Sequence, residues 1–267
     1  MQNHCKTALA AVAAAGCLSL LPWASAAAAS GNVQTKFIYP QIAPAKQVVQ
    51  TSEGDVTGDG KLDKIELLGI KKDPASNYYD KLVVKVTGGG DGKSAETALG
   101  GGYTPTVRLC DFTGDGALET FVTASTGGSG GLSTFYLNSW AKGQPKTLAL
   151  PVPLKAVGTY ENNYIVKFDV PEQKKSFRID VRDKKADYDQ SGLYRGGLLT
   201  RPQSADVLPF SELRPMDTDR DGICELVGFQ RATGLYNADT VAYALSLWKY
   251  QGNKWKLVNT VVVKAKV

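Results

Sequence analysis

Apolar and polar residues alternate in short runs along most of the chain after residue 30, and turns rich in Gly or Asp separate the runs. Alternation with a period of two over about four to eight positions, with many β-branched and aromatic residues, is typical of half-buried strands. The clearest runs are 81–86, 119–124, 133–140 and 241–248. No segment after residue 30 has the apolar spacing of a convincing amphipathic helix. The pattern therefore predicts an all-β protein built from antiparallel sheets.

A nine-residue segment recurs three times without gaps, as DVTGDGKLD at 55–63, DFTGDGALE at 111–119 and DTDRDGICE at 217–225. The second copy starts 56 residues after the first, and the third starts 106 residues after the second. These spacings are close to one and two units of about 53 residues. Each copy is followed by strand-like runs separated by polar turns. Such a repeat predicts a β-propeller-like array of about four antiparallel blades, three of them carrying an Asp-rich loop.

Residues 158–201 break the spacing of the repeat and are interpreted as a divergent blade or an insertion. Within them, the runs 164–170 and 176–181 predict a hairpin, and 186–192 resembles an acidic loop that has lost its spacing. No linker-like change of composition divides the chain after residue 29, so 30–267 is expected to be a single domain. Its Lys pairs are scattered and do not form a stripe interleaved with aromatics, which argues against nucleic-acid binding. An unknown protein or glycan ligand is the expected partner, and weak attraction to an anionic cell wall is an alternative.

Residues 1–29 are interpreted as a signal peptide, because a mainly apolar run from Ala8 to Trp23 precedes the small residues at which signal peptidase cleaves. This run is too short, and too interrupted by Pro, to span a membrane as a helix. We therefore expect a secreted or otherwise extracytoplasmic protein with no transmembrane segment. The alternative is a lipoprotein tethered to a membrane through Cys17.

Histidine and cysteine are scarce, and this scarcity excludes several kinds of chemistry. The single histidine, His4, and two of the four cysteines, Cys5 and Cys17, lie in the expected signal peptide. An exported chain would then have no imidazole for a Ser-His-Asp triad, a Cys-His pair or a His-ligated zinc site. Cys110 and Cys224 are interpreted as buried small hydrophobic residues, while a single disulfide between them stays open.

The three copies carry oxygen-bearing side chains at alternate positions, which is the arrangement that calcium needs. Ca²⁺ takes about six to eight oxygen ligands at about 2.3–2.6 Å. Asp, Glu or Thr occupies positions 1, 3, 5 and 9 of each copy, and Gly at position 6 permits a sharp bend. With the backbone carbonyl of position 7, the predicted ligands are Asp55, Thr57, Asp59, Lys61 and Asp63; Asp111, Thr113, Asp115, Ala117 and Glu119; and Asp217, Asp219, Asp221, Ile223 and Glu225. Up to three Ca²⁺ ions are therefore expected. The residues at position 8, Leu62, Leu118 and Cys224, are expected to turn inward and anchor the loops.

Ordinary turns and EF-hands can also contain Asp and Gly at close spacing. In an ordinary turn these residues serve the backbone, and no ion is involved. Three carboxylates at this spacing would repel one another without a cation, however, and the spacing occurs three times. An EF-hand would need a bidentate ligand at position 12, where Glu66 stands in the first copy but Val122 and Gly228 stand in the others. Calcium loops between strands are therefore the favoured interpretation.

The loops Asp-x-Thr-Gly-Asp-Gly-x-x-Asp/Glu, each opening a group of strands, resemble the FG-GAP and VCBS-type repeats of bacterial secreted proteins, a repeat that the integrin α-subunit propeller shares. The resemblance implies calcium binding by the three sets of loop residues named above. The Phe-Gly and Gly-Ala-Pro signposts of that family are not evident.

These observations lead to an expected function of calcium-stabilised binding or scaffolding at or outside the cell surface, without catalysis. One alternative is a calcium-dependent hydrolase that uses carboxylates outside the loops, with Asp187 and Asp189 as first candidates beside Tyr188 and Tyr194. Another is a glycan- or peptide-binding, adhesin-like module whose face is formed by turns such as 127–131 and 235–237.

Overall fold

The computed structural model describes residues 45–265, so the expected signal peptide and Cys17, the alternative lipoprotein cysteine, lie outside the described residues. The strands of the first half are β1 (Lys46–Gly54), β2 (Asp63–Ile70), β3 (Tyr78–Thr87), β4 (Ser94–Cys110), β5 (Glu119–Ser125), β6 (Ser133–Ser139) and β7 (Lys146–Thr147). Those of the second half are β8 (Val157–Glu161), β9 (Ile165–Val170), β10 (Lys175–Asp180), β11 (Tyr194–Arg195), β12 (Leu198–Leu199), β13 (Ser204–Met216), β14 (Glu225–Thr233), β15 (Thr240–Gln251) and β16 (Lys254–Lys264). The one α-helix of the described residues is α1 (Lys185–Gln190), and the short 3₁₀ turns are η1 (Ala141–Gly143), η2 (Pro171–Gln173) and η3 (Arg182–Lys184).

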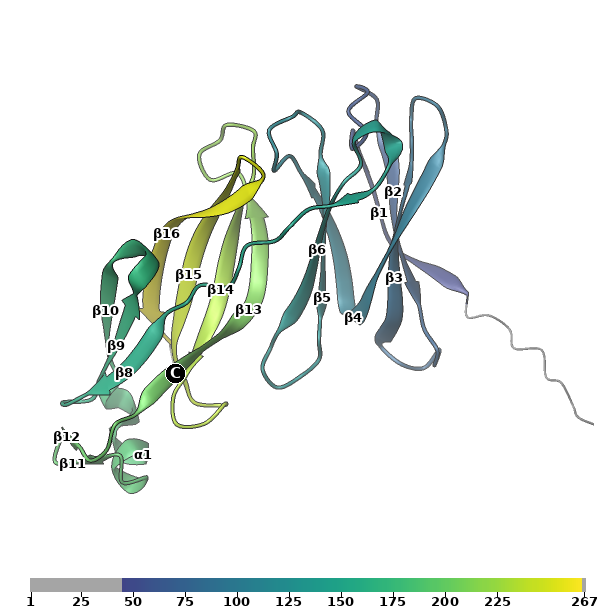
Figure 1. The fold of residues 1–267 in the computed structure, drawn as a ribbon. Coiled ribbons are helices and arrows are strands. Elements are labelled where there is room, and N and C mark those ends of the chain that lie inside the picture. The colour runs from purple at the N-terminus through teal and green to yellow at the C-terminus, as the bar shows by residue number, and fades with distance from the viewer. Residues whose placement is uncertain (1–44, 266–267) are drawn as a thin grey trace, which may run out of the picture. The chain divides into compact units, whose positions relative to one another are not determined.

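Two seven-stranded antiparallel sheets hold almost all of these strands (Figure 1). The first runs in chain order from β1 to β7, and the second has the order β10-β9-β8-β13-β14-β15-β16. The strands β11 and β12 form a separate small ladder. The prediction of an all-β protein with antiparallel sheets is therefore confirmed.

The predicted division into about four separate blades differs from this topology, because two long strands continue from one group into the next. The first half of β4 pairs with β3 and its second half pairs with β5, with a break in register between Tyr103 and Thr106. In the same way β13 pairs briefly with β8 and then with β14. Separate blades would need each of these strands to end between two groups. Instead β4 and β13 continue, and only their pairing register is interrupted.

Residues 158–201 combine a hairpin with the short helix α1. The predicted hairpin is present, since β9 pairs with β10 over six residues on each strand. The stretch after it, which resembles an acidic loop in sequence, instead forms η3 and α1. A helix of six residues spans less than two turns, so it leaves almost no periodic pattern in the sequence.

The core consists of three clusters of buried apolar side chains. One gathers residues of β2, β3, β4 and β5 around Trp140, and a second joins the two sheets through residues such as Phe121 and Trp248. The third packs β8, β9 and β10 with α1 against β14 and β15. Each buried indole also has a polar partner, because Trp140 Nε1 donates to Thr120 Oγ1 and Trp248 Nε1 to Ser246 Oγ, both over 2.8 Å.

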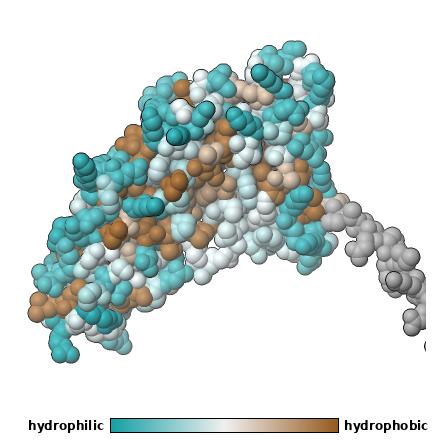
Figure 2. Space-filling view, viewed as in Figure 1, coloured by the Kyte–Doolittle hydropathy of each residue, from teal (hydrophilic) through white to brown (hydrophobic). Residues whose placement is uncertain are grey.

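The surface mixes hydrophilic residues with smaller apolar areas (Figure 2). Exposed apolar side chains include Val258, Val261 and Val263, which all lie on β16. Across residues 45–265 no helix is long and apolar enough to cross a membrane.

Candidate metal-binding loops

The three repeated segments form three hairpin connections of the same design, here called loop 1 (55–63), loop 2 (111–119) and loop 3 (217–225). Each joins two antiparallel neighbours, β1 to β2, β4 to β5, and β13 to β14. The closing pairs are Gly54 with Asp63, Cys110 with Glu119, and Met216 with Glu225. Position 9 of every loop is therefore the first residue of the returning strand.

The aspartate at position 1 holds the loop backbone. In loop 1, Asp55 Oδ1 accepts the N–H groups of Gly58 over 2.7 Å and Asp59 over 3.2 Å, while Oδ2 accepts that of Gly60 over 2.8 Å. The same residue in loop 2, Asp111, accepts from positions 4 and 6, and Asp217 in loop 3 accepts from positions 5 and 6. This bonding holds the turn through the protein's own groups.

Positions 4 and 6 both require a left-handed backbone. At position 6 the φ angles of Gly60, Gly116 and Gly222 are 80°, 86° and 88°, as the sequence predicts. Position 4 has the same conformation, which the sequence pattern did not predict. It is glycine in loops 1 and 2 but Arg220, with φ of 63°, in loop 3.

The acid at position 9 is buried in all three loops, with exposed fractions of 0% for Asp63 and Glu119 and 2% for Glu225. Asp63 is the most fully bonded of the three. It accepts hydrogen bonds from the N–H groups of Val56, Thr57 and Gly89 over 2.8–2.9 Å and from the Thr57 hydroxyl over 3.3 Å.

Glu119 in loop 2 has fewer partners. It accepts the Phe112 N–H over 2.7 Å and the Thr113 hydroxyl over 3.1 Å. Burial raises the pKa of Glu119 to about 7, and the neighbouring carboxylates of Asp115 and Asp111 add to the rise. Among the described residues, no Lys or Arg forms an ion pair with an acid of loop 1 or loop 2.

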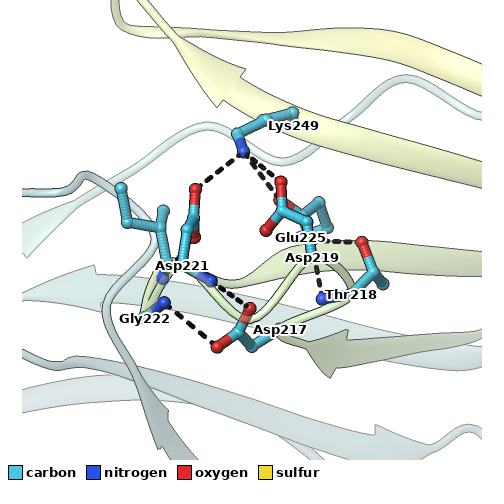
Figure 3. A network of polar contacts seen from close by, with 8 residues as sticks. Asp217, Thr218, Asp219, Asp221, Gly222, Glu225 and Lys249 are labelled. Atoms are coloured by element: carbon cyan, nitrogen blue, oxygen red, sulfur yellow. Dashed lines mark hydrogen bonds and ion pairs between the residues drawn. The ribbon is translucent and has the colours of Figure 1, made fainter.

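Loop 3 differs because a lysine lies among its acids (Figure 3). Lys249, on β15, places Nζ 3.0 Å from Asp219, 3.1 Å from Asp221 and 3.2 Å from Glu225. These contacts raise the pKa of Lys249, those with Asp219 most of all. Within the described residues, this loop alone brings three carboxylates close enough to share one metal ion, since oxygens of Asp217, Asp219 and Asp221 all lie within 4.8 Å of one another.

The loops also stack on one another through their backbones. The N–H of Leu118, at position 8 of loop 2, donates to the carbonyl of Asp55 over 2.9 Å. The N–H of Cys224, at position 8 of loop 3, donates to the carbonyl of Asp111 over 2.6 Å. A disulfide between Cys110 and Cys224 reinforces the second contact, with the two Cα atoms 6.1 Å apart.

The stacking explains where the expectation for position 8 fails. Leu118 packs against the first core cluster and Cys224 is buried in the second, as expected. Leu62 is 68% exposed, so the prediction that it turns inward is wrong. In loops 2 and 3, position 8 lies against the preceding loop. No Asp-rich loop precedes loop 1 in the described residues, so Leu62 has no such loop to pack against.

The candidate catalytic acids outside the loops lie in α1. Asp189 pairs with Lys185 and accepts the Tyr164 hydroxyl over 2.7 Å. The bond with Lys185, followed by that with Tyr164, lowers the pKa of Asp189. Tyr188 is buried and donates instead to Asp239 over 2.9 Å.

The fold and these loops define an all-β protein with three stacked acidic hairpin loops. The family model of the YybI C-terminal domain matches residues 154–263. The uncharacterized protein YybI of Bacillus subtilis (strain 168) is 30% identical over 231 residues, covering 84% of this chain and 88% of that protein. The chain therefore belongs to the YybI family. No solved structure matches it.

This result corrects the resemblance to FG-GAP and VCBS-type repeats, since the family that matches is YybI. The resemblance rested on a short segment whose features have local causes. Asp at position 1 bonds the loop backbone, and Gly at position 6 supplies a left-handed φ. A tight hairpin in an unrelated family can need the same residues, so the segment does not specify a family.

Proposed function

We propose that the chain is an exported, calcium-stabilised β protein that acts as a binding or scaffold module and not as an enzyme. Export rests on the signal-like residues 1–29. Calcium binding rests on the three loops, which would hold the ion with the carboxylates at positions 1, 5 and 9, the oxygen at position 3 and the carbonyl at position 7.

Loop 2 carries the calcium part of the proposal. Glu119 is fully buried, Asp111 is 8% exposed, and no cationic side chain of the described residues pairs with either. Burying like charges without a counter-charge is costly, whereas a divalent cation would relieve both their desolvation and their repulsion. The donor set, all oxygen and partly carboxylate, is the kind that Ca²⁺ prefers.

Loop 1 is a second candidate, with a cavity beside it. A cavity of about 330 Å³ is lined by Thr57 and Asp59 of the loop and by Asp91, Lys93 and Lys142. Its size is within the range of small-ligand sites, and its lining is mixed in charge. A small polar ligand such as a sugar is one that a binding module could accept there.

The proposal that the protein is not an enzyme is supported by the contacts and the lowered pKa of Asp189, one of the two candidate catalytic acids in α1. Asp189, held by Lys185 and Tyr164 with a lowered pKa, is poorly suited to give up a proton as a general acid near neutral pH. Screening the purified protein on glycans and phosphodiesters tests this directly, and turnover that Asp187→Asn abolishes would contradict it.

Thermal unfolding with and without calcium tests the calcium part. At a calcium concentration about 100 times the Kd, binding stabilises the fold by about 2.7 kcal/mol per site, which corresponds to about 5–10 °C in a chain of this size. Glu119→Gln should lose at least half of the calcium-dependent rise, because it removes the buried charge while keeping the shape.

Asp206→Asn is the matched control, because Asp206 is an exposed acid outside the loops. It should keep the full rise in melting temperature. A wild-type melting temperature that is the same in chelator and in calcium would contradict the proposal.

A further inference from the structure

The contacts of Lys249 differ from those of an ordinary surface ion pair. Its ammonium meets acids from positions 3, 5 and 9 of loop 3 within 3.0–3.2 Å, and its side chain is only 23% exposed (Figure 3). These are the positions whose oxygens would surround a metal ion. The ammonium therefore marks the point on which the loop oxygens converge.

A buried oxygen gives independent support for a cation at this point. Glu225 Oε1 is buried and accepts no hydrogen bond, while Oε2 accepts both the N–H and the hydroxyl of Thr218. The only positive charge near Oε1 among the described residues is Lys249 Nζ, at 3.2 Å. A carboxylate oxygen that is buried, is directed at the convergence point and has an ammonium as its one partner among the described residues is placed to act as a metal ligand.

The strand register shows why loop 3 alone has such a lysine. The residue after position 9 pairs across the sheet with Thr87 in loop 1, Asn138 in loop 2 and Trp248 in loop 3. The next residue along the pairing strand is Gly88, Ser139 or Lys249. Loops 1 and 2 therefore have an uncharged residue at the place where loop 3 has an ammonium.

We propose that Lys249 is a tethered counter-ion that occupies the cation position of loop 3, so that this loop is a calcium site closed by its own lysine. The tether gives the ammonium an effective concentration in the millimolar range, against which Ca²⁺ must compete. Three carboxylates, those of Asp219, Asp221 and Glu225, face this one ammonium, so its removal leaves a site that favours a divalent ion. The inference deepens the proposed function, because loop 3 is one of the three proposed calcium loops. It rests on that function only in that calcium is the ion used to test it.

Native mass spectrometry of the Lys249→Met variant, equilibrated with CaCl₂, tests this inference. Methionine keeps the aliphatic stem and removes the charge, so the variant should bind one more Ca²⁺ ion than the wild type at the same concentration. The wild type should need at least ten times more calcium to fill the same site. Adding Glu225→Gln to Lys249→Met should remove the extra ion.

Other outcomes separate the two proposals. If the wild type binds no ion and Lys249→Met binds one, the inference holds while calcium binding at loops 1 and 2 fails. Equal stoichiometry and affinity in the wild type and Lys249→Met would overturn the inference. Lys249→Gln, with a neutral polar end, serves as a second variant if Lys249→Met does not fold. A larger calcium-dependent rise in its melting temperature than in the wild type would support the inference, and an equal rise would overturn it.

Discussion

The backbone N–H of Cys224 donates to the carbonyl oxygen of Asp111 over 2.6 Å, which places loop 3 directly against loop 2. Leu118 and Asp55 make the equivalent contact between loops 2 and 1. Because the contacts join position 8 of one loop to position 1 of the preceding loop, each acidic turn supports the next. The loops are therefore one stacked unit, although 97 residues (120–216) separate loop 2 from loop 3 in the sequence.

The disulfide should contribute a large part of the stability of this stack. It closes a chain segment of 114 residues, so replacing Cys110 and Cys224 together by Ala should lower the free energy of unfolding by about 2–5 kcal/mol. Urea unfolding of both proteins, with and without a reductant, measures this. The reductant should destabilise the wild type and leave the variant unchanged, and an unchanged wild-type midpoint would contradict the prediction.

Arg220 should be a point of strain. It is the one non-glycine residue at position 4, where all three loops have a left-handed φ. Replacing Arg220 by Gly should therefore stabilise the protein by about 0.5 kcal/mol, the relief of backbone strain minus the entropy that glycine loses on folding.

The matched change in loop 2 should have the opposite sign. Gly114 has φ of 74°, and a Cβ added there would lie 3.0 Å from Ile223 Cδ1 in loop 3. Gly114→Ala should therefore cost about 1–2 kcal/mol in urea unfolding. Equal effects of Gly114→Ala and Arg220→Gly would show that position 4 carries no conformational constraint.

The stability of the metal-free protein should depend on pH through Glu119. Its pKa is about 7 in the folded protein, above its ordinary value of 4.5, so between these values the folded state binds more protons than the unfolded state. The contribution of Glu119 to the free energy of unfolding should thus be greatest below about pH 4.5. It should fall by about 1–3 kcal/mol as the pH rises through 7.

Urea unfolding of calcium-free protein at pH 5 and pH 8 measures this dependence. Glu119→Gln should remove most of it, since glutamine has no proton to lose. A wild type and a variant with the same pH slope would show that Glu119 titrates normally. In the presence of calcium the affinity should rise over the same pH range, because the ligand must be ionised.

A polar network in the second sheet should be sensitive to a single methyl group. Asp239 is buried, pairs with Lys184 over 2.9 Å and accepts the Tyr188 hydroxyl over 2.9 Å. A Cβ at Gly234 would clash with Asp239 Oδ2 and the Tyr160 hydroxyl. Gly234→Ala should cost about 1–3 kcal/mol, whereas Gly128→Ala, whose Cβ would lie 4.0 Å from Thr126 Oγ1, should cost little.

Local rules predicted the parts of the molecule that depend on nearby residues. Alternation indicated the strands, the hairpin of β9 and β10 followed from two apolar runs, and glycine at position 6 indicated its left-handed φ. The propeller-like division did not follow, because it depends on whether β4 and β13 end or continue between groups of strands. A register irregularity within a strand leaves no clear sign in the alternation.

The parts of the site that the sequence pattern did not predict come from residues far apart in the chain. Lys249 lies 24 residues after Glu225, and only the pairing of β14 with β15 brings it to loop 3. The other two copies of the repeat give no signal of it, because Gly88 and Ser139 stand at the equivalent places. The exposure of Leu62 likewise depends on which loop stacks on which, a relationship that no single loop contains.

The central claim is that the acidic loops bind calcium. Counting the bound ions tests this claim most directly. Native mass spectrometry of wild-type protein, equilibrated with CaCl₂ and then exchanged into a volatile buffer that keeps free calcium in the micromolar range, should show at least one bound Ca²⁺ ion. Asp115→Ala and Glu119→Gln should each lose one ion. A wild-type protein that shows only the metal-free mass under these conditions would contradict the account.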